Sequence, residues 1–182
     1  MIRRGRHYTA LSEEHQHLAV LLLGMRINNW LRIRDWGSVV RDMQRMLAEL
    51  SDAPQAGLLR TESYWMGRNF IEIQYWQDIT KLDEYVHNGA MSHLTAWKNY
   101  AARTKNRDSV GFYHEIYIVG ETPLEAVYSN MPPVGLAAAV GQLEAVTHRT
   151  NGREKLDRYR RELKDAHEEE PKSRRSESQP EP

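Results

Sequence analysis

The sequence contains no cysteine. Disulfides, thiolate metal sites, iron–sulfur clusters and cysteine nucleophiles are therefore excluded. A chain without cysteine fits a reducing compartment, and we expect the protein to be cytoplasmic. The longest apolar run, residues 18–23, is far shorter than the roughly 20 residues of a membrane-spanning helix. No apolar segment with a cleavage site follows the basic start at residues 1–4, so we predict neither a membrane partner nor an export signal.

The sequence also lacks an excess of charge of either sign. It has 25 basic and 25 acidic side chains and a formal net charge of +0. Proteins that bind nucleic acids usually carry a basic excess that neutralises phosphates, so we expect no nucleic-acid partner. The sequence contains no GxGxxG loop, and thus no nicotinamide-binding fingerprint.

Hydrophobic residues occur in patterns that predict alternating strands and helices. The apolar run opens a buried strand over residues 18–27. Asp35 is positioned to cap a helix that continues to Leu50 with apolar residues at helical spacing. A three-residue turn at residues 67–69 then predicts a hairpin of residues 58–66 and 70–76.

The second half of the domain repeats this order. Asp78 is expected to cap a second helix, which Asn88 and Gly89 interrupt and residues 90–103 continue. A fourth strand follows over residues 110–119, then a short strand at 125–128 and a rigid loop at 131–136. The resulting order, strand–helix–strand–strand–helix–strand, is the split βαβ pattern of ferredoxin-like α+β domains.

We therefore predict a ferredoxin-like domain over residues 1–150 and a charged tail, partly helical and partly disordered, over residues 151–182. In such a domain the helices cover one face of the sheet. Two copies commonly cover the other face by closing a dimeric α/β barrel, so we expect a homodimer.

Six ordered segments carry a resemblance to a known family. They comprise Met25-Arg26-Ile27-Asn28 followed by Trp36, then residues 43–50, Gln74-Tyr75-Trp76, His93-Leu94-Thr95-Ala96-Trp97, residues 111–117 and residues 125–136. Together they resemble a domain-of-unknown-function family labelled monooxygenase-like, after a protein of the fumagillin pathway. The resemblance spans about residues 6–140 and implies the dimeric α/β-barrel fold.

The resemblance also implies a range of activities. The wider fold group includes cofactor-free monooxygenases, haem-degrading enzymes and haem-dependent dehydratases. We accordingly expect a monooxygenase-like oxidoreductase that binds a small apolar or aromatic substrate between the sheet and the second helix. The alternatives are a haem-binding protein, such as a haem degrader or an aldoxime-dehydratase relative, and a non-catalytic carrier of small ligands on the same dimer.

The candidate site centres on His93. By the resemblance, Asn28, Trp76 and His93 occupy the strands and helix on which haem degraders carry an Asn, a Trp and a His ligand. His93 is therefore a candidate catalytic residue, and a metal ligand if haem is the cofactor. Trp97 and Tyr100 share its helix face and could wall a substrate. A helix histidine with a purely structural hydrogen bond is the alternative reading.

Three polar residues on the strands complete the candidates. Arg26 could bind an anionic substrate, or it could form an ion pair with Glu72 or Glu115. His114 and Glu115 must point to opposite faces of the fourth strand. We consider Glu115 a candidate acid or base and His114 a substrate contact, with a structural polar pair as the alternative.

Overall fold

The computed structural model describes residues 1–9, 17–104, 108–119, 126–141, 144–145, 161 and 164. It forms two compact units, Met1–Ala145 and Val146–Pro182. Apart from Arg161 and Lys164, which are helical, the predicted tail lies outside the described residues. The account below concerns the first unit.

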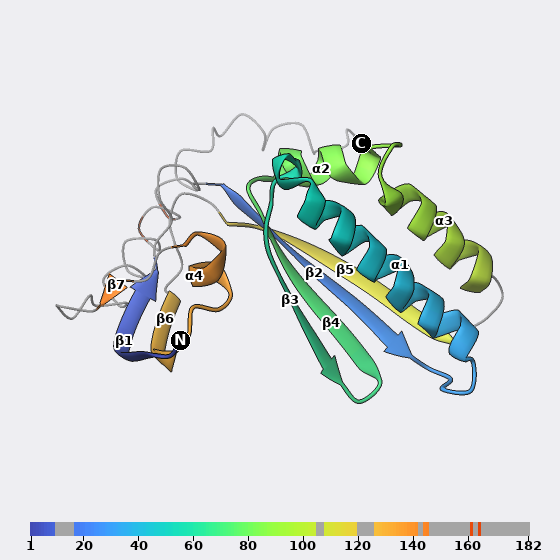
Figure 1. The fold of residues 1–182 in the computed structure, drawn as a ribbon, viewed down its shortest axis with the longest axis horizontal. Coiled ribbons are helices and arrows are strands. Elements are labelled where there is room, and N and C mark those ends of the chain that lie inside the picture. The colour runs from blue at the N-terminus through green and yellow to red at the C-terminus, as the bar shows by residue number, and fades with distance from the viewer. Residues whose placement is uncertain are drawn as a thin grey trace, which may run out of the picture. The chain divides into compact units, whose positions relative to one another are not determined.

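A four-stranded antiparallel sheet forms the centre of this unit, in the order β3-β4-β2-β5 (Figure 1). Its strands are β2 (Leu18–Ile27), β3 (Leu58–Met66), β4 (Asn69–Trp76) and β5 (Val110–Val119). β2 is bonded on both sides, to β4 and β5, which explains its run of apolar residues. The predicted strands are therefore confirmed, and the strand order is that of a ferredoxin-like split βαβ domain.

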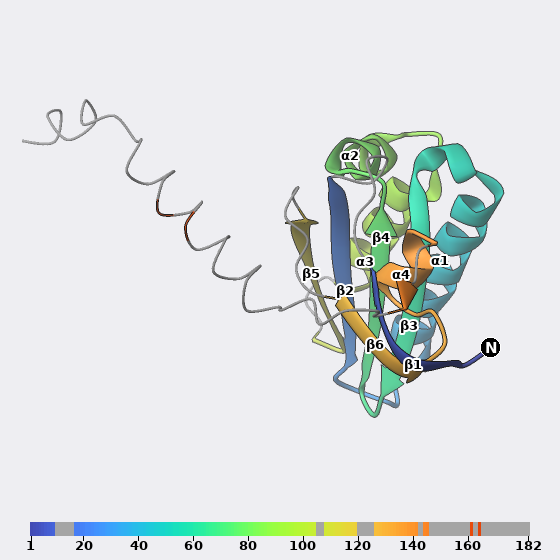
Figure 2. The same ribbon diagram turned by 90° about the vertical axis from the view of Figure 1, so that its left-hand side faces the viewer.

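The helices α1 (Ile33–Asp52) and α3 (Ser92–Thr104) lie over one face of this sheet (Figure 1). The shorter helix α2 (Ile79–His87) lies across one end of the sheet (Figure 2). Two groups of buried side chains fill the space beneath the helices. One contains Leu21, Leu50, Trp76 and Leu82, and the other contains Met25, Ile27 and Val110.

The helix caps are partly as predicted. Asp78 caps α2, because its Oδ1 accepts a hydrogen bond of 2.7 Å from the Lys81 N–H. The expected cap at Asp35 is wrong: α1 begins at Ile33, and Asp35 lies inside the first turn. Its buried carboxylate accepts a hydrogen bond of 2.7 Å from the Ser109 hydroxyl and so ties α1 to the start of β5.

A second, smaller sheet was not predicted, although one of its strands was. β1 (Arg3–Thr9) pairs with β6 (Ala126–Met131) and with β7 (Glu144–Ala145). β1 contains three arginines with glycine, histidine, tyrosine and threonine, so it carries no apolar alternation that would indicate a strand. β6 corresponds to the short strand expected near residues 125–128 and extends it to Met131. Part of the predicted rigid loop is likewise ordered as the short helix α4 (Leu136–Ala139).

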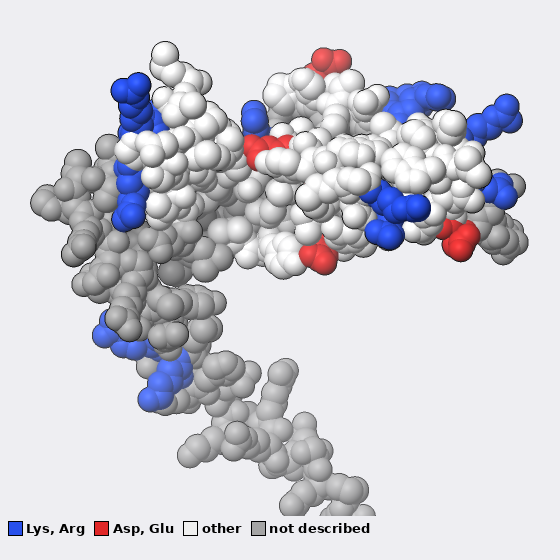
Figure 3. Space-filling view, turned by 90° about the horizontal axis from the view of Figure 1, so that it is seen from below, with Lys and Arg blue, Asp and Glu red and all other residues white. Residues whose placement is uncertain are grey.

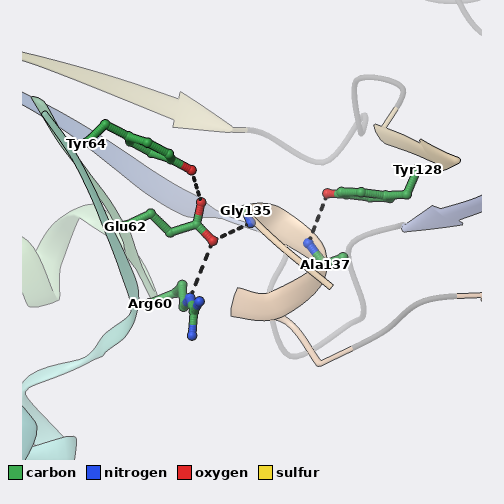
Figure 4. Close-up of polar contacts among 6 residues, drawn as sticks. All are labelled: Arg60, Glu62, Tyr64, Tyr128, Gly135 and Ala137. Atoms are coloured by element: carbon green, nitrogen blue, oxygen red, sulfur yellow. Dashed lines mark hydrogen bonds and ion pairs between the residues drawn. The ribbon is translucent and has the colours of Figure 1, made fainter. Parts of the chain in front are cut away.

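The start of α4 is fixed against the face of the main sheet that the other helices leave open (Figure 4). Glu62 on β3 accepts hydrogen bonds of 2.7 Å from the Gly135 N–H and 2.8 Å from the Tyr64 hydroxyl, and Arg60 lies 3.5 Å from it. The Tyr128 hydroxyl accepts a hydrogen bond of 3.1 Å from the Ala137 N–H. These bonds satisfy backbone donors at the beginning of the helix.

The surface agrees with the balanced composition. On the face shown in Figure 3, Lys and Arg side chains of the described residues stand in separate groups with a few Asp and Glu between them. Uncharged side chains cover most of the remaining area of that face. Within the part of the chain that is described, no helix has both the length and the apolar character needed to cross a membrane.

Candidate active site

Helices α1 and α3 enclose a cleft above the centre of the sheet, here called the His93 cleft. It is a cavity of about 90 Å³. Its walls include Leu21, Leu23, Val39, Met43, Gln74, Tyr85, His93, Trp97, Tyr100 and Phe112. Most of these side chains are apolar or aromatic, so the few polar atoms among them determine what the cleft can recognise.

His93 is half-buried in this cleft and has a defined tautomer. Its Nδ1 lies 3.2 Å from the Val86 carbonyl oxygen. A carbonyl can only accept, so Nδ1 carries the hydrogen and Nε2 presents a lone pair. Among the described residues Nε2 has no hydrogen-bond partner. Burial lowers the pKa of His93 from its ordinary value of 6.5, so the ring is a neutral base at pH 7.

Tyr85 on α2 stands beside this base. The two rings lie 5.8 Å apart between centroids. The Tyr85 hydroxyl is buried, and it has no hydrogen-bond partner among the described residues. Burial raises the pKa of Tyr85 far above its ordinary value, with smaller contributions from Glu49 and Glu72, so the hydroxyl keeps its proton at pH 7. The cleft thus contains a proton acceptor and a proton donor, neither of them used by the fold.

Aromatic rings close the other side of the cleft. Trp97 and Tyr100 lie 5.6 Å apart on α3, and both contact Phe112 on β5, at 5.8 and 5.7 Å. His114 follows at 6.2 Å from Phe112 and is exposed. The structure therefore brings three of the predicted residues, His93, Trp97 and Tyr100, to one cavity, with His114 at the end of its aromatic wall.

Gln74 of β4 lines the floor of the cleft together with Leu21 and Leu23 of β2, and it belongs to a row of three hydrogen-bonded side chains. The Trp76 N–H donates to Gln74 Oε1 at 3.0 Å, and Gln74 Nε2 donates to Glu72 Oε1 at 2.5 Å. An indole N–H can only donate, which fixes the orientation of the Gln74 amide and makes Glu72 Oε1 an acceptor. Trp76 itself is fully buried behind Gln74 and stacks on Tyr85 at 5.4 Å.

Glu72 belongs to a second cavity, of about 440 Å³, between α1 and the β3–β4 edge of the sheet; we call it the Glu72 cavity. Its lining is largely apolar and includes Trp65 and Phe70. The side chain of Glu72 has no exposed surface, and its Oε2 has no hydrogen-bond partner among the described residues. Burial raises the pKa of Glu72, which the nearby Gln74, Thr61 and Ser63 side chains only partly offset.

The two cavities adjoin. Leu23, Val39, Met43 and Phe112 line both of them. Met43 has an unbranched, flexible side chain, so it can move with little loss of packing energy. A ligand larger than the His93 cleft therefore has room to extend toward the Glu72 cavity.

The remaining predicted residues lie elsewhere. Arg26 is exposed on the opposite face of the sheet and donates to Asn69 Oδ1 at 3.2 Å, so the ion pair expected with Glu72 or Glu115 is not formed. Asn28 lies beyond the end of β2, where its Nδ2 donates to the Asp108 carbonyl at 2.7 Å. Neither residue lines the His93 cleft, which corrects the expectation that they share it with His93.

Glu115 is on the open face as well. It accepts a hydrogen bond of 2.5 Å from the Tyr117 hydroxyl. His114 faces the helices, so the predicted alternation of the two residues is confirmed. Sequence reasoning gave no role to Tyr85 and considered Glu72 as an ion-pair partner of Arg26. The available signal was that Glu72 and Gln74, which are polar, share one face of the strand with the aromatic residues Phe70 and Trp76.

Comparison with solved structures supports this fold. An aldoxime dehydratase (OxdRE) in complex with butyraldoxime is 13% identical, with a TM-score of 0.56 over 73% of this chain and 42% of that one. A second aldoxime dehydratase is 15% identical, with a TM-score of 0.57 over 80% of this chain and 46% of that one. The chain thus spans less than half the length of these dehydratase chains.

A smaller protein shows a weaker likeness. The cofactor-independent oxygenase SnoaB from Streptomyces nogalater is 11% identical, with a TM-score of 0.41 over 55% of this chain and 90% of that one. Among curated proteins, none matches the sequence significantly. The family model described as "Monooxygenase af470-like" matches residues 18–136, which include the whole main sheet and all the helices above it. The chain therefore belongs to the Monooxygenase af470-like family.

Proposed function

We propose that this protein is a cofactor-free, monooxygenase-like oxidoreductase that oxidises a small aromatic or apolar substrate in the His93 cleft. The observation that carries the proposal is the free Nε2 of His93. Its partner atom Nδ1 is held by the Val86 carbonyl, which orients a neutral ring toward an apolar cavity. A base of this kind can remove a proton from a carbon acid.

The chemistry follows from the two unused groups of the cleft. His93 Nε2 takes a proton from a carbon next to a carbonyl, and the Tyr85 hydroxyl donates a hydrogen bond to the enolate oxygen that forms. The enolate is electron-rich and transfers two electrons to O₂ as a new carbon–oxygen bond forms. Protonation gives a hydroperoxide, which loses water and leaves a carbonyl group. The balance is CH₂ + O₂ → C=O + H₂O, and it requires no external reductant.

Haem, the alternative cofactor, fits the residues of the cleft only in part. His93 Nδ1 donates to a backbone carbonyl, as the outer nitrogen of a metal-binding histidine usually does. However, the cleft alone is about 90 Å³, whereas sites for drug-sized ligands are roughly 300–1,000 Å³, and haem is larger than most of these. Haem would have to extend into the Glu72 cavity, whose lining also contains no Lys or Arg. Of the residues that line the cleft, Asp42 is acidic and none is Lys or Arg, so nothing there pairs with propionates. The site therefore favours the cofactor-free reaction.

A second copy of the chain would complete the assembly. The open face of the main sheet exposes Tyr64 (48%), Tyr113 (43%) and Tyr117 (55%). The Tyr113 ring also lies directly over Gly24, so closely that even a Cβ at that position would collide with it. Flat aromatic side chains of this kind gain stability when a second apolar surface covers them. We propose that the surface is the same face of another copy.

The proposal is tested by oxygen uptake in the presence of 2-indanone, a small aromatic ketone with acidic C–H bonds, or of its substituted analogues. One O₂ should be consumed for each indane-1,2-dione formed, without added cofactor. The variant His93→Ala should reduce the rate roughly 100-fold or more. A Soret band in the purified protein would favour the haem alternative. Tight binding of the ketones without turnover would favour the ligand carrier.

A further inference from the structure

We infer that the Glu72 cavity is a separate recognition site for an uncharged aromatic ketone, whose carbonyl oxygen accepts a hydrogen bond from the protonated carboxyl of Glu72. The inference concerns binding alone. It stands whether or not His93 abstracts a proton in the neighbouring cleft. It assigns a ligand class to a cavity that the proposed reaction does not use.

The location of the proton on Glu72 follows from its neighbours. The Trp76 N–H holds Gln74 Oε1, and Gln74 therefore directs its Nε2 hydrogens toward Glu72 Oε1. Oε1 is thus occupied as an acceptor. The proton of a neutral carboxyl must then lie on Oε2, which has no partner among the described residues. Glu72 is thus an oriented O–H donor: the Thr61 and Ser63 hydroxyls lie close enough to act on its carboxyl, but among the described residues neither forms a hydrogen bond with Oε2.

A neutral carboxyl is the form that this location favours. The side chain is fully buried, and the cavity above it is lined mainly by Leu, Val, Met, Phe and Trp side chains. No described residue forms a salt bridge with Glu72 within 4.0 Å. An unpaired carboxylate in such surroundings would have a large desolvation cost, whereas the protonated acid has a small one.

The groups packed around Glu72 do not supply a competing charge. In the strand register Glu72 lies opposite Ser63 on β3 and Leu23 on β2. Neither these side chains nor Thr61 carries a charge. Tyr85 on α2 stays protonated at neutral pH because its pKa is raised. From α1, Glu49 acts on Tyr85, and its carboxylate accepts from the Ser92 N–H at 2.9 Å.

The shape and lining of the cavity indicate the rest of the ligand. A volume of about 440 Å³ lies within the range of small-molecule sites. Trp65 and Phe70, whose rings are 5.8 Å apart, supply an aromatic wall. Met43 and Gln44, two long unbranched side chains of the lining, can shift to give a ligand access to the carboxyl at the floor. An aromatic ring would pack against this wall, and a carbonyl substituent on the ring would accept a hydrogen bond from the Glu72 O–H.

A matched pair of probes tests this inference. In 2-acetylnaphthalene the ring carries a carbonyl, and in 2-isopropenylnaphthalene a methylene group of the same shape replaces the carbonyl oxygen. At pH 6 the wild-type protein should bind the ketone about tenfold more tightly, as one good hydrogen bond predicts. Titration calorimetry measures both affinities. Glu72→Gln retains an N–H donor and should keep the preference, whereas Glu72→Leu should bind both probes equally.

The pH dependence gives a second readout. A carboxylate cannot donate, so the preference of the wild-type protein for the ketone should fall as the pH rises through the raised pKa of Glu72. The preference of Glu72→Gln should not change with pH. This comparison decides the matter even if Glu72→Leu does not fold.

The control separates this site from the His93 cleft. His93→Ala should leave the tenfold preference intact, even if it abolishes oxygen uptake. Equal affinity of the wild-type protein for the two probes would overturn the inference, as would failure to bind either probe. So would a preference that survives in Glu72→Leu or is lost in His93→Ala.

Discussion

Tyr85 is costly for folding, and we propose that it is useful for chemistry. Its hydroxyl is buried without a partner among the described residues, which ordinarily destabilises a protein by about 1–3 kcal/mol. Glu72 Oε2 and Thr61 Oγ1 are in the same position. Buried polar atoms without partners are rare in native proteins, and functional sites are one of the places where they are retained.

We predict that Tyr85→Phe separates stability from activity. The phenylalanine ring preserves the stack on Trp76 and removes the unpaired hydroxyl, so the free energy of unfolding should stay the same or rise. The loss of the donor to the enolate should reduce the rate of ketone oxidation roughly 100-fold. Urea denaturation and oxygen uptake measure the two effects. Full activity in Tyr85→Phe would remove this residue from the mechanism.

Glu72 should make stability depend on pH. Its pKa is raised above the ordinary value of 4.5, so the folded protein binds more protons than the unfolded chain between these two values. The contribution of Glu72 to the free energy of unfolding should therefore be largest below pH 4.5. It should decrease as the pH rises toward the pKa of Glu72 in the folded protein. Denaturation at several pH values should show this decline in the wild-type protein and not in Glu72→Gln. Equal slopes in both would contradict a buried neutral carboxyl.

Gln74 links Trp76 to Glu72, and its removal should destabilise the fold. Gln74→Leu leaves the Trp76 N–H and Glu72 Oε1 without partners in the core, and we expect a loss of about 2 kcal/mol in the free energy of unfolding. Gln77→Leu, one residue beyond the end of the same strand and exposed, should change it by less than about 0.5 kcal/mol. A similar effect of both substitutions would mean that the row of hydrogen bonds contributes nothing.

At the scale of elements, much of the main sheet and its helices could be predicted from the sequence. β2 was evident because a central strand is apolar on both faces, and α1 because its apolar residues follow helical spacing. β1 could not be predicted, since its partners β6 and β7 are more than 100 residues away and its own residues are mostly charged or polar. Local patterns do not report pairing over such distances.

The site was predicted less completely than the fold, for a related reason. His93, Trp97 and Tyr100 were found because one helix face brings them together. Arg26 and Asn28 were wrongly grouped with them, because the sequence does not specify which face of β2 the helices cover. Leu21, Leu23 and Met25 face the helices, which places Arg26 on the other side.

At the scale of elements, a side chain added at Gly135 should destabilise the start of α4. It has a φ of +55°, and a Cβ there would lie 3.1 Å from the Tyr75 hydroxyl, beside the bond that Glu62 accepts. Gly135→Ala should lower the free energy of unfolding by about 1–3 kcal/mol. Gly37→Ala, in the interior of α1 with open space around it, should raise it by about 0.5–1 kcal/mol. Opposite signs in urea denaturation are the expected result, and a stabilising Gly135→Ala would contradict the fixed start of α4.

At the scale of the whole molecule, the open face of the sheet should determine the assembly. Light scattering at micromolar concentration should give twice the chain mass of 21.3 kDa. Tyr117→Lys places a charge within the proposed contact and should produce a monomer. Ile33→Lys, at an equally exposed position at the start of α1, should leave the dimer intact. A wild-type monomer would contradict the barrel-forming assembly.

We propose that the chemistry of the molecule lies between the sheet and the helices, and that its assembly uses the other face of the sheet. The residues of the His93 cleft accordingly come from the helix-facing sides of β2, β4 and β5 and from the helices, while Arg26 and Glu115 lie on the other face of the sheet. The central claim is that His93 acts as a base, and it concerns one atom, Nε2.

That claim is tested most directly by hydrogen exchange without oxygen. Under anaerobic conditions in D₂O, the protein should catalyse deuterium incorporation at the acidic carbons of 2-indanone, as followed by NMR. The exchange rate should rise with pH to a plateau. The midpoint of the rise should lie below pH 6.5, because burial lowers the pKa of His93. His93→Ala should reduce the exchange roughly 100-fold. Exchange at the same rate in the wild-type protein and in His93→Ala would contradict the account.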